Sequence, residues 1–174
     1  RRRAALASEP LRQQIPGSRQ TMIETLSHGI TCIDTGYHRA GLAACYLVVD
    51  DGEAALIETG TALNLPAILQ ALTECGVAPE QLRYIMPTHV HLDHAGGAGA
   101  LLARCQQATL VAHPRGARHL IDPERLIAGA KAVYGEDSFT RMYGEIVPAP
   151  AERVREAADG SRWTLGRREL LVRD

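Results

Sequence analysis

The sequence predicts an α+β domain, and two patterns carry that prediction. Antiparallel strands open the chain, because the apolar stretches 42–49 and 54–58 flank a hairpin signal, Asp-Asp-Gly, at 50–52. Strands and helices then alternate, beginning with apolar residues at helical spacing over 65–75, which Gly76 ends. A length of 174 residues favours a single domain.

The remaining elements follow from apolar runs and their flanking turn residues. Strands are expected at 23–33, 42–49, 54–58, 82–86 and 108–112. Helices are expected at 65–75, 97–104, 114–120 and 123–134. Three short strands, 154–156, 162–165 and 169–172, are predicted to form a terminal meander that turns at Asp159-Gly160.

Residues 1–21 differ in composition from the rest of the chain. They hold five arginines and a single acidic residue, and two prolines interrupt any helix. No apolar stretch follows the arginines, so a secretory signal is not indicated. We therefore expect a disordered basic tail or upstream remnant at 1–21 and one domain over 22–174.

Composition excludes several classes of function. The net charge of −1 gives no electrostatic drive toward nucleic acid or a membrane surface. No apolar run reaches the roughly 20 residues that span a bilayer. The four cysteines form no C-x-x-C pair, which favours reduced structural thiols in a cytoplasmic protein.

The most informative segment is the run Thr-His-Val-His-Leu-Asp-His at 88–94. Three histidines and one aspartate lie within six positions, and imidazole and carboxylate are ligands for zinc, iron and manganese. The run follows the predicted strand 82–86 and Pro87, and glycines come after it at 96 and 97. This context favours a loop between a strand and a helix.

The conformation of the run decides which ligands share an ion. In a strand, His89, His91 and Asp93 would share one face, whereas in a helix side chains three or four apart would meet. A loop can instead direct His89 and His91 to one ion and Asp93 and His94 to a neighbouring one. The sequence thus indicates a site for one or two metal ions.

The pattern His89-x-His91-x-Asp93-His94 resembles the metal-binding signature of the metallo-β-lactamase superfamily. The stretch Ala-Ala-Leu-Ile-Glu-Thr-Gly at 54–60 resembles the second strand motif of that family. Thr88 and the Ala-Gly-Gly at 95–97 are similar to its glyoxalase-II-like branch. The resemblance covers residues 22–174.

The resemblance implies a four-layer αββα sandwich, of which this chain would form the N-terminal portion. It makes His89 and His91 ligands of a first metal, and Asp93 and His94 ligands of a second. Glu58 stands where the family usually has aspartate, a residue that supports the metal loop through hydrogen bonds without binding metal.

The family places three further ligands later in the chain, the first of them a histidine. Because no histidine follows His119, the chain is expected to end before that third ligand histidine, as the N-terminal half to two-thirds of such an enzyme. We also expect such a fragment to be marginally stable or to form a homo-oligomer through exposed apolar surface.

The implied activity is metal-dependent hydrolysis of a small molecule. A metal-bound hydroxide would attack an ester, thioester, lactone or related bond, and Asp93 would orient the nucleophile or carry its proton. Zn²⁺, as one or two ions, is the expected cofactor, with Fe²⁺ or Mn²⁺ as alternatives. Two other functions stay open: a mononuclear non-haem iron oxidoreductase acting on persulfides, and a truncated, non-catalytic metal-binding module.

Four residues outside the run are candidates for substrate contact. Tyr37, His38 and Arg39 follow the first strands, in a loop that can overhang the metals in the resembling family. His113 ends a predicted strand and could border the same pocket.

Overall fold

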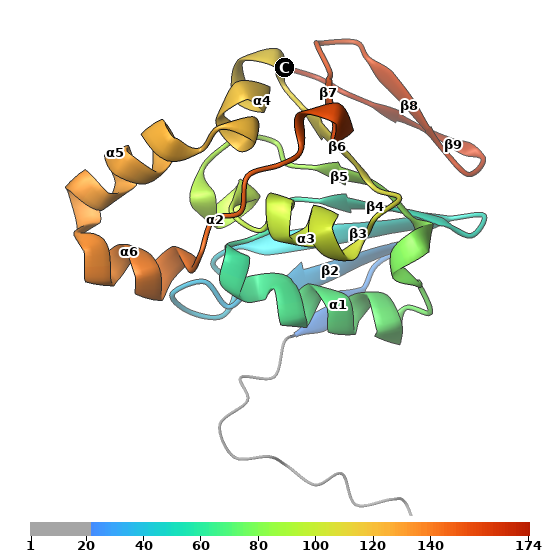
Figure 1. Cartoon of the computed structure of the whole chain (residues 1–174). Helices are drawn as coiled ribbons and strands as arrows, with labels where there is room; N and C mark the ends of the chain where they lie inside the picture. Colours follow the sequence, from blue (N-terminus) through green and yellow to red (C-terminus); the bar gives the residue numbers. More distant parts are fainter. Residues whose placement is uncertain (1–21) are drawn as a thin grey trace, which may run out of the picture.

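The computed structural model describes residues 22–174, and the predicted tail at 1–21 lies outside them. A seven-stranded sheet forms the centre, with its strands in chain order (Figure 1). The strands are β1 (Ile23–Thr25), β2 (Ile30–Asp34), β3 (Ala44–Asp50), β4 (Glu53–Ile57), β5 (Leu82–Met86), β6 (Thr109–Ala112) and β7 (Val154–Glu156). Strands β1 to β4 pair antiparallel, and β4 to β7 pair parallel.

Two turns shape the antiparallel part of the sheet. The predicted turn between β3 and β4 is present, with Asp51 and Gly52 both at positive φ, as a two-residue hairpin turn requires. The strand region predicted at 23–33 contains two strands, because a turn with His28 and Gly29 at positive φ divides it into β1 and β2. Both turns let the chain fold back without splaying the strands.

Two helices cover one face of the sheet, α1 (Leu65–Glu74) and α3 (Ala98–Arg104) (Figure 1). The side chains of Leu47 and Leu56 point from the sheet into this layer and are fully buried. Ile68 of α1 and Leu102 of α3 meet them from the helices. The helical spacing at 65–75 therefore marks a face buried in the main core, as predicted.

A second group of helices connects β6 to β7. It consists of α4 (Pro114–Ile121), α5 (Glu124–Tyr134) and α6 (Glu136–Tyr143). Helix α6 was not predicted, and Gly135 at positive φ separates it from α5. Phe139 and Tyr143 of α6 pack with Leu92 in a small cluster of their own. This helical excursion allows β7 to return parallel to β6.

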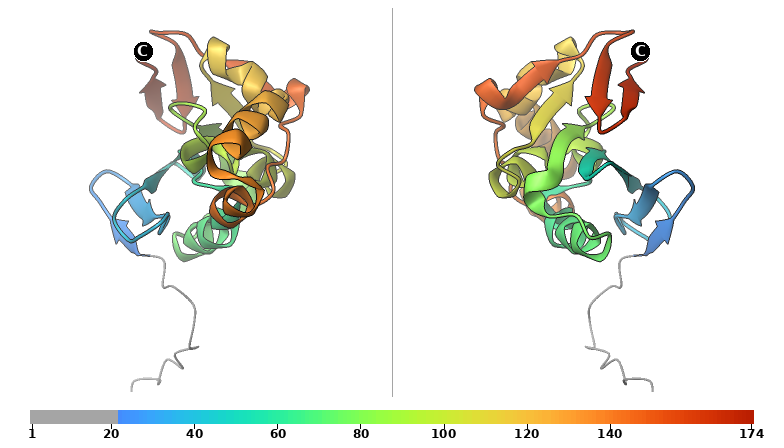
Figure 2. Two further views of the ribbon diagram at one scale, coloured as in Figure 1. Left: turned by 90° about the vertical axis from the view of Figure 1, so that its left-hand side faces the viewer. Right: turned by 90° about the vertical axis from the view of Figure 1, so that its right-hand side faces the viewer.

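The opposite face of the sheet carries a separate two-stranded sheet, β8 (Arg162–Leu165) and β9 (Arg168–Leu171) (Figure 2). The predicted terminal meander is wrong, because β7 belongs to the main sheet and β8 pairs only with β9. The β8–β9 hairpin turns at Gly166, whereas Asp159-Gly160 only links β7 to β8. Leu165 packs against Val48 and Ala55, so the hairpin adds a further layer to the sheet.

Short 3₁₀ turns complete the connections: η1 (Ala62–Asn64), η2 (Pro79–Gln81) and η3 (Ala151–Arg153). The four cysteines are free thiols, as predicted. Within residues 22–174, no helix has both the length and the apolar character that crossing a membrane requires.

Candidate metal centre

The histidine-rich run lies at the carboxyl end of β5, where the predicted loop contains one short helix, α2 (Leu92–Ala95). His91 precedes this helix, and its carbonyl oxygen accepts hydrogen bonds from the backbone N–H groups of His94 and Ala95 at 2.9 and 2.8 Å. Asp93 and His94 therefore lie within a helical turn, while His89 lies in a bend and His91 directly precedes the helix.

The end of β4 holds this loop in place through Thr59. Its backbone N–H and its hydroxyl both donate to the carbonyl oxygen of His94, at 2.7 and 2.9 Å. The Thr59 hydroxyl also accepts from the N–H of Gly97 at 3.1 Å. A Cβ at Gly97 would lie 2.9 Å from the carbonyl oxygen of Thr59, so a glycine is required for this close approach.

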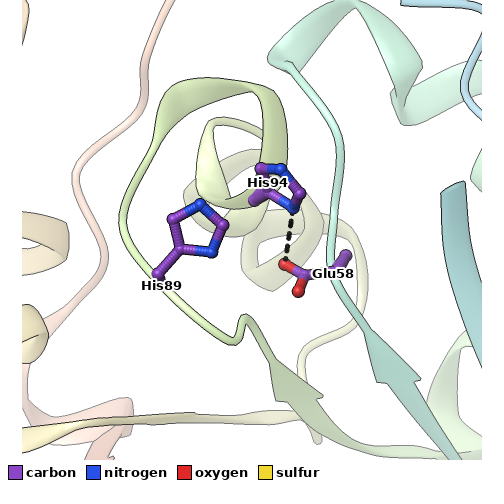
Figure 3. A group of neighbouring side chains, drawn as sticks. All are labelled: Glu58, His89 and His94. Carbon is purple, nitrogen blue, oxygen red and sulfur yellow. Dashed lines mark ion pairs between the residues drawn. The ribbon is translucent and has the colours of Figure 1, made fainter. Parts of the chain in front are cut away.

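Glu58 points from the same strand end into the histidine cluster (Figure 3). It adopts a φ of 63°, which is unusual for a residue with a side chain and is often found at functional sites. Its Oε1 accepts a hydrogen bond from the N–H of Thr88 at 3.2 Å. Its Oε2 is buried, has no hydrogen-bond partner among residues 22–174, and lies 3.5 Å from Nδ1 of His94.

Two of the four predicted ligands, His89 and His94, form a compact group with Glu58, whereas His91 and Asp93 lie beside that group. The ring centroid of His89 lies 4.7 Å from that of His91 and 4.2 Å from that of His94. Nε2 of His94 lies 3.5 Å from Oδ2 of Asp93. One ligand atom each from Glu58, His89 and His94 falls within 4.8 Å of the others. The two carboxylates therefore flank one imidazole ring, with Glu58 at Nδ1 and Asp93 at Nε2.

The surroundings of His89 favour its neutral imidazole form. The pKa of His89 is lowered from its usual value, first by burial and then by the neighbouring rings of His94 and His91. Neutral imidazole is the form that binds metal, since a protonated ring has no free lone pair. His89 is thus in the state that a cation needs.

The donor set fits a divalent cation. Three imidazoles and two carboxylates suit zinc, iron or manganese. A buried carboxylate oxygen without a partner is costly unless a cation or a histidine N–H satisfies it. Oε2 of Glu58 lies 3.5 Å from Nδ1 of His94, so an N–H on that nitrogen or a cation between the two groups would satisfy it. The role of each residue as a metal ligand stays a prediction.

The candidates for substrate contact lie in separate cavities. Tyr37, His38 and Arg39 line one cavity, and the Tyr37 side chain also packs in the cluster that contains Leu92 of α2. His113 lines two others, of about 360 and 380 Å³, and His89 lines the second of these. The structure therefore does not bring all four candidates to one pocket.

One neighbour of these candidates was missed by the sequence analysis. The hydroxyl of Tyr37 donates to the hydroxyl of Tyr143 at 3.2 Å, although 106 residues separate the two in sequence. Burial is the first cause that raises the pKa of both phenols, so both stay protonated at neutral pH. No local sequence pattern marks Tyr143 as a partner of Tyr37.

A mixed sheet covered by helices, with a histidine-rich loop at the carboxyl end of β5, defines a class of α/β protein with a candidate metal site. Residues 38–171 match the metallo-beta-lactamase superfamily, and the chain belongs to that superfamily. The superfamily assignment and the fold class predicted from the sequence are thereby confirmed. No curated protein sequence matches the chain.

Solved structures of metallo-beta-lactamases share the fold. One, described as the first B3 enzyme with an active site glutamic acid, has a TM-score of 0.63 and 25% identity, over 87% of this chain and 51% of that one. An enzyme from Cronobacter sakazakii with a HARLDQ motif has a TM-score of 0.60 and 24% identity, over 83% and 50%. The subclass B3 enzyme MEM-A1, from a soil metagenome library, has a TM-score of 0.60 and 24% identity, over 83% and 49%.

The chain spans about half the length of these solved structures. Their likeness at this level of identity establishes the fold and leaves the substrate open. The glyoxalase-II-like branch stays a prediction.

Proposed function

We propose that this chain carries the metal-binding residues of a metal-dependent hydrolase acting on an ester, thioester, lactone or related bond in a small molecule. The observation that carries the proposal is the compact group of Glu58, His89 and His94, with Asp93 and His91 beside it. Membership of the metallo-beta-lactamase superfamily supports the same class of reaction.

Each residue of the cluster would have a separate role in the reaction. His89, His91, Asp93 and His94 would hold one or two cations, and zinc is the proposed metal. A cation bound there supplies Lewis acidity, which acidifies a water molecule and polarises a carbonyl group. The Asp93 carboxylate would orient the attacking oxygen and accept its proton. Glu58 would fix the His94 ring, and Thr59 would hold the loop through the carbonyl oxygen of His94.

The first experiment measures metal per chain by elemental analysis. We expect near-stoichiometric zinc in the purified chain and its loss in the double variant His89→Ala, His91→Ala. The double variant His28→Ala, His119→Ala removes two histidines that lie outside the cluster and is the matched control. Equal metal in both double variants, or none in any protein, would contradict the proposed site.

The second experiment separates hydrolysis from the alternatives. Metal-loaded protein is assayed against a panel of ester, thioester, lactone and phosphoester substrates, and we expect turnover of at least one class. Iron in place of zinc, with oxygen uptake on a persulfide, would support the oxidoreductase. A loaded protein that turns over nothing in either assay would support the non-catalytic metal-binding module.

A further inference from the structure

A cavity of about 740 Å³ lies beside the loop 34–40, between that loop, η1 and α6. Its volume is in the range of small-molecule sites, roughly 300–1,000 Å³. The apolar side chains of Met22, Leu63 and Met142 contribute to its wall, and Arg39 and Arg141 bring positive charge to it. The lining thus combines an apolar surface with two guanidinium groups.

The positive charge of the cavity is available to a ligand. Within residues 22–174, no carboxylate lies within 4.0 Å of the guanidinium of Arg39 or Arg141. Arg141 donates only to the hydroxyl of Ser138, at 3.2 Å. The one lining carboxylate, Asp34, already accepts hydrogen bonds through both oxygens, from the N–H groups of Gly36 and Gly41 at 2.9 Å each. The lining therefore includes two arginines and a single carboxylate, whose oxygens already accept hydrogen bonds.

The loop that presents Arg39 is held in one conformation. Asp34 clamps its two ends, and the carbonyl oxygen of Thr35 accepts a hydrogen bond from the Asn64 side chain at 2.6 Å. Gly36 and His38 adopt positive φ, which gives the loop its tight path. Such preorganisation lowers the entropy lost when a ligand is bound.

Tyr37 connects this cavity to the metal centre. Its ring lines the cavity, and it also packs in the cluster around Leu92, the residue that precedes Asp93 in α2. Tyr37 therefore borders both the cavity and helix α2, which carries Asp93 and His94.

We propose that this cavity binds an anionic head group, a carboxylate or a phosphate, of a substrate whose apolar body lies along Met22, Leu63 and Met142. Arg39 and Arg141 bind the head group, since a guanidinium matches the geometry of either anion. The inference rests on the proposed function, because it places the bond to be hydrolysed near Asp93.

The test measures binding of octanoate and octyl phosphate to the full chain by isothermal titration calorimetry, with octanamide as the neutral probe. The double variant Arg39→Gln, Arg141→Gln removes both cavity guanidinium groups. The double variant Arg104→Gln, Arg125→Gln removes the same charge from exposed residues outside the cavity and is the matched control. Each protein is titrated as purified and after EDTA treatment, so that binding is read independently of the metal.

We expect at least one anion to bind at least ten times more tightly than octanamide. The cavity variant should lose at least tenfold in affinity for it and the control variant less than twofold, with or without EDTA. The inference would be overturned if both variants bound the anion with equal affinity, or if octanamide bound as tightly as the anions. It would also be overturned if neither anion bound, or if binding disappeared after EDTA treatment. If the metal-loaded chain bound the anion as expected but hydrolysed no substrate, the result would contradict the proposed function and leave the inference about the cavity intact.

Discussion

The side chains on the two faces of the seven-stranded sheet are buried to different extents. On the face under α1 and α3, Leu47 and Leu56 are fully buried in the main core. On the opposite face, Ile57 and Tyr84 are only partly buried, and Tyr46 is 40% exposed, although the β8–β9 hairpin covers part of this surface. The helix layer thus completes one face, while the hairpin covers the other only in part.

The residues that position the metal centre belong to the more deeply buried side of the molecule. Thr59 and Glu58 reach the histidine loop from the end of β4, and helix α3 begins directly after the loop at Ala98. Both supports belong to elements of the main core. We therefore expect changes in the helix-covered face to affect stability most, and changes in the hairpin face least.

The largest effect is expected for Leu102→Ala. This side chain is fully buried between α3 and the sheet, so its truncation leaves a cavity and should cost about 2–5 kcal/mol of the free energy of unfolding. Urea unfolding followed by circular dichroism measures the change. The control Val133→Ala, at a side chain that is 75% exposed, should stay within about 0.5 kcal/mol of the parent.

The next effect is expected for Arg153→Met. The guanidinium donates to the carbonyl oxygens of Leu102, Cys105 and Ala108 at 2.6–3.2 Å, and so ties η3 to the end of α3. Without it these carbonyls lose their donor, and we expect a loss of about 1–3 kcal/mol in the same unfolding experiment. Arg155→Met, which removes a guanidinium bonded only to nearby backbone, should cost less.

Glu58→Gln is expected to weaken metal binding while leaving the fold intact. The amide oxygen can still accept from the N–H of Thr88, but the negative charge facing Nδ1 of His94 is lost. Loss of such a support typically lowers metal affinity about 10–100-fold, which competition with a chelator measures. Glu58→Asp keeps the charge and should recover part of the affinity. Unchanged affinity in the glutamine variant would show that Glu58 does not act on His94.

A smaller effect is expected for Leu170→Ala, on the hairpin face. Leu170 is only partly buried against Val48 and Ala55, so its truncation should cost about 1 kcal/mol of the free energy of unfolding. A cost equal to that of Leu102→Ala would contradict this expectation, because the two faces of the sheet would then contribute equally to stability.

The smallest effect is expected in the pH dependence of stability. Because the folded state lowers the pKa of His89 below 6.5, the unfolded chain binds its proton first as the pH falls. This contribution to stability is present above about pH 6.5 and is lost as the pH falls through the folded pKa. Metal-free His89→Gln should therefore show a shallower loss of stability between about pH 7 and pH 5, measured by urea unfolding. An identical slope in both proteins would contradict it.

Local patterns predicted several elements well. The strand at 82–86 and the helix at 65–75 agree with β5 and α1, because each has an apolar pattern of the right period and a clear stop. The predicted meander at the end of the chain was wrong. The local sequence at 154–156 does not indicate whether this strand pairs with the next strand in sequence or returns to the main sheet. That choice depends on the helical excursion α4 to α6.

The sequence by itself determined the ligand-rich run at 88–94 and its place after a strand, because donor types and local spacing are properties of the chain. Only the tertiary structure decided that the carboxylate of Glu58 faces His94 and that Tyr37 meets Tyr143. Both contacts join residues far apart in sequence. They form because parallel strand pairing and helix packing bring the end of β4, the loop at 34–40 and α6 to the same side of the metal loop.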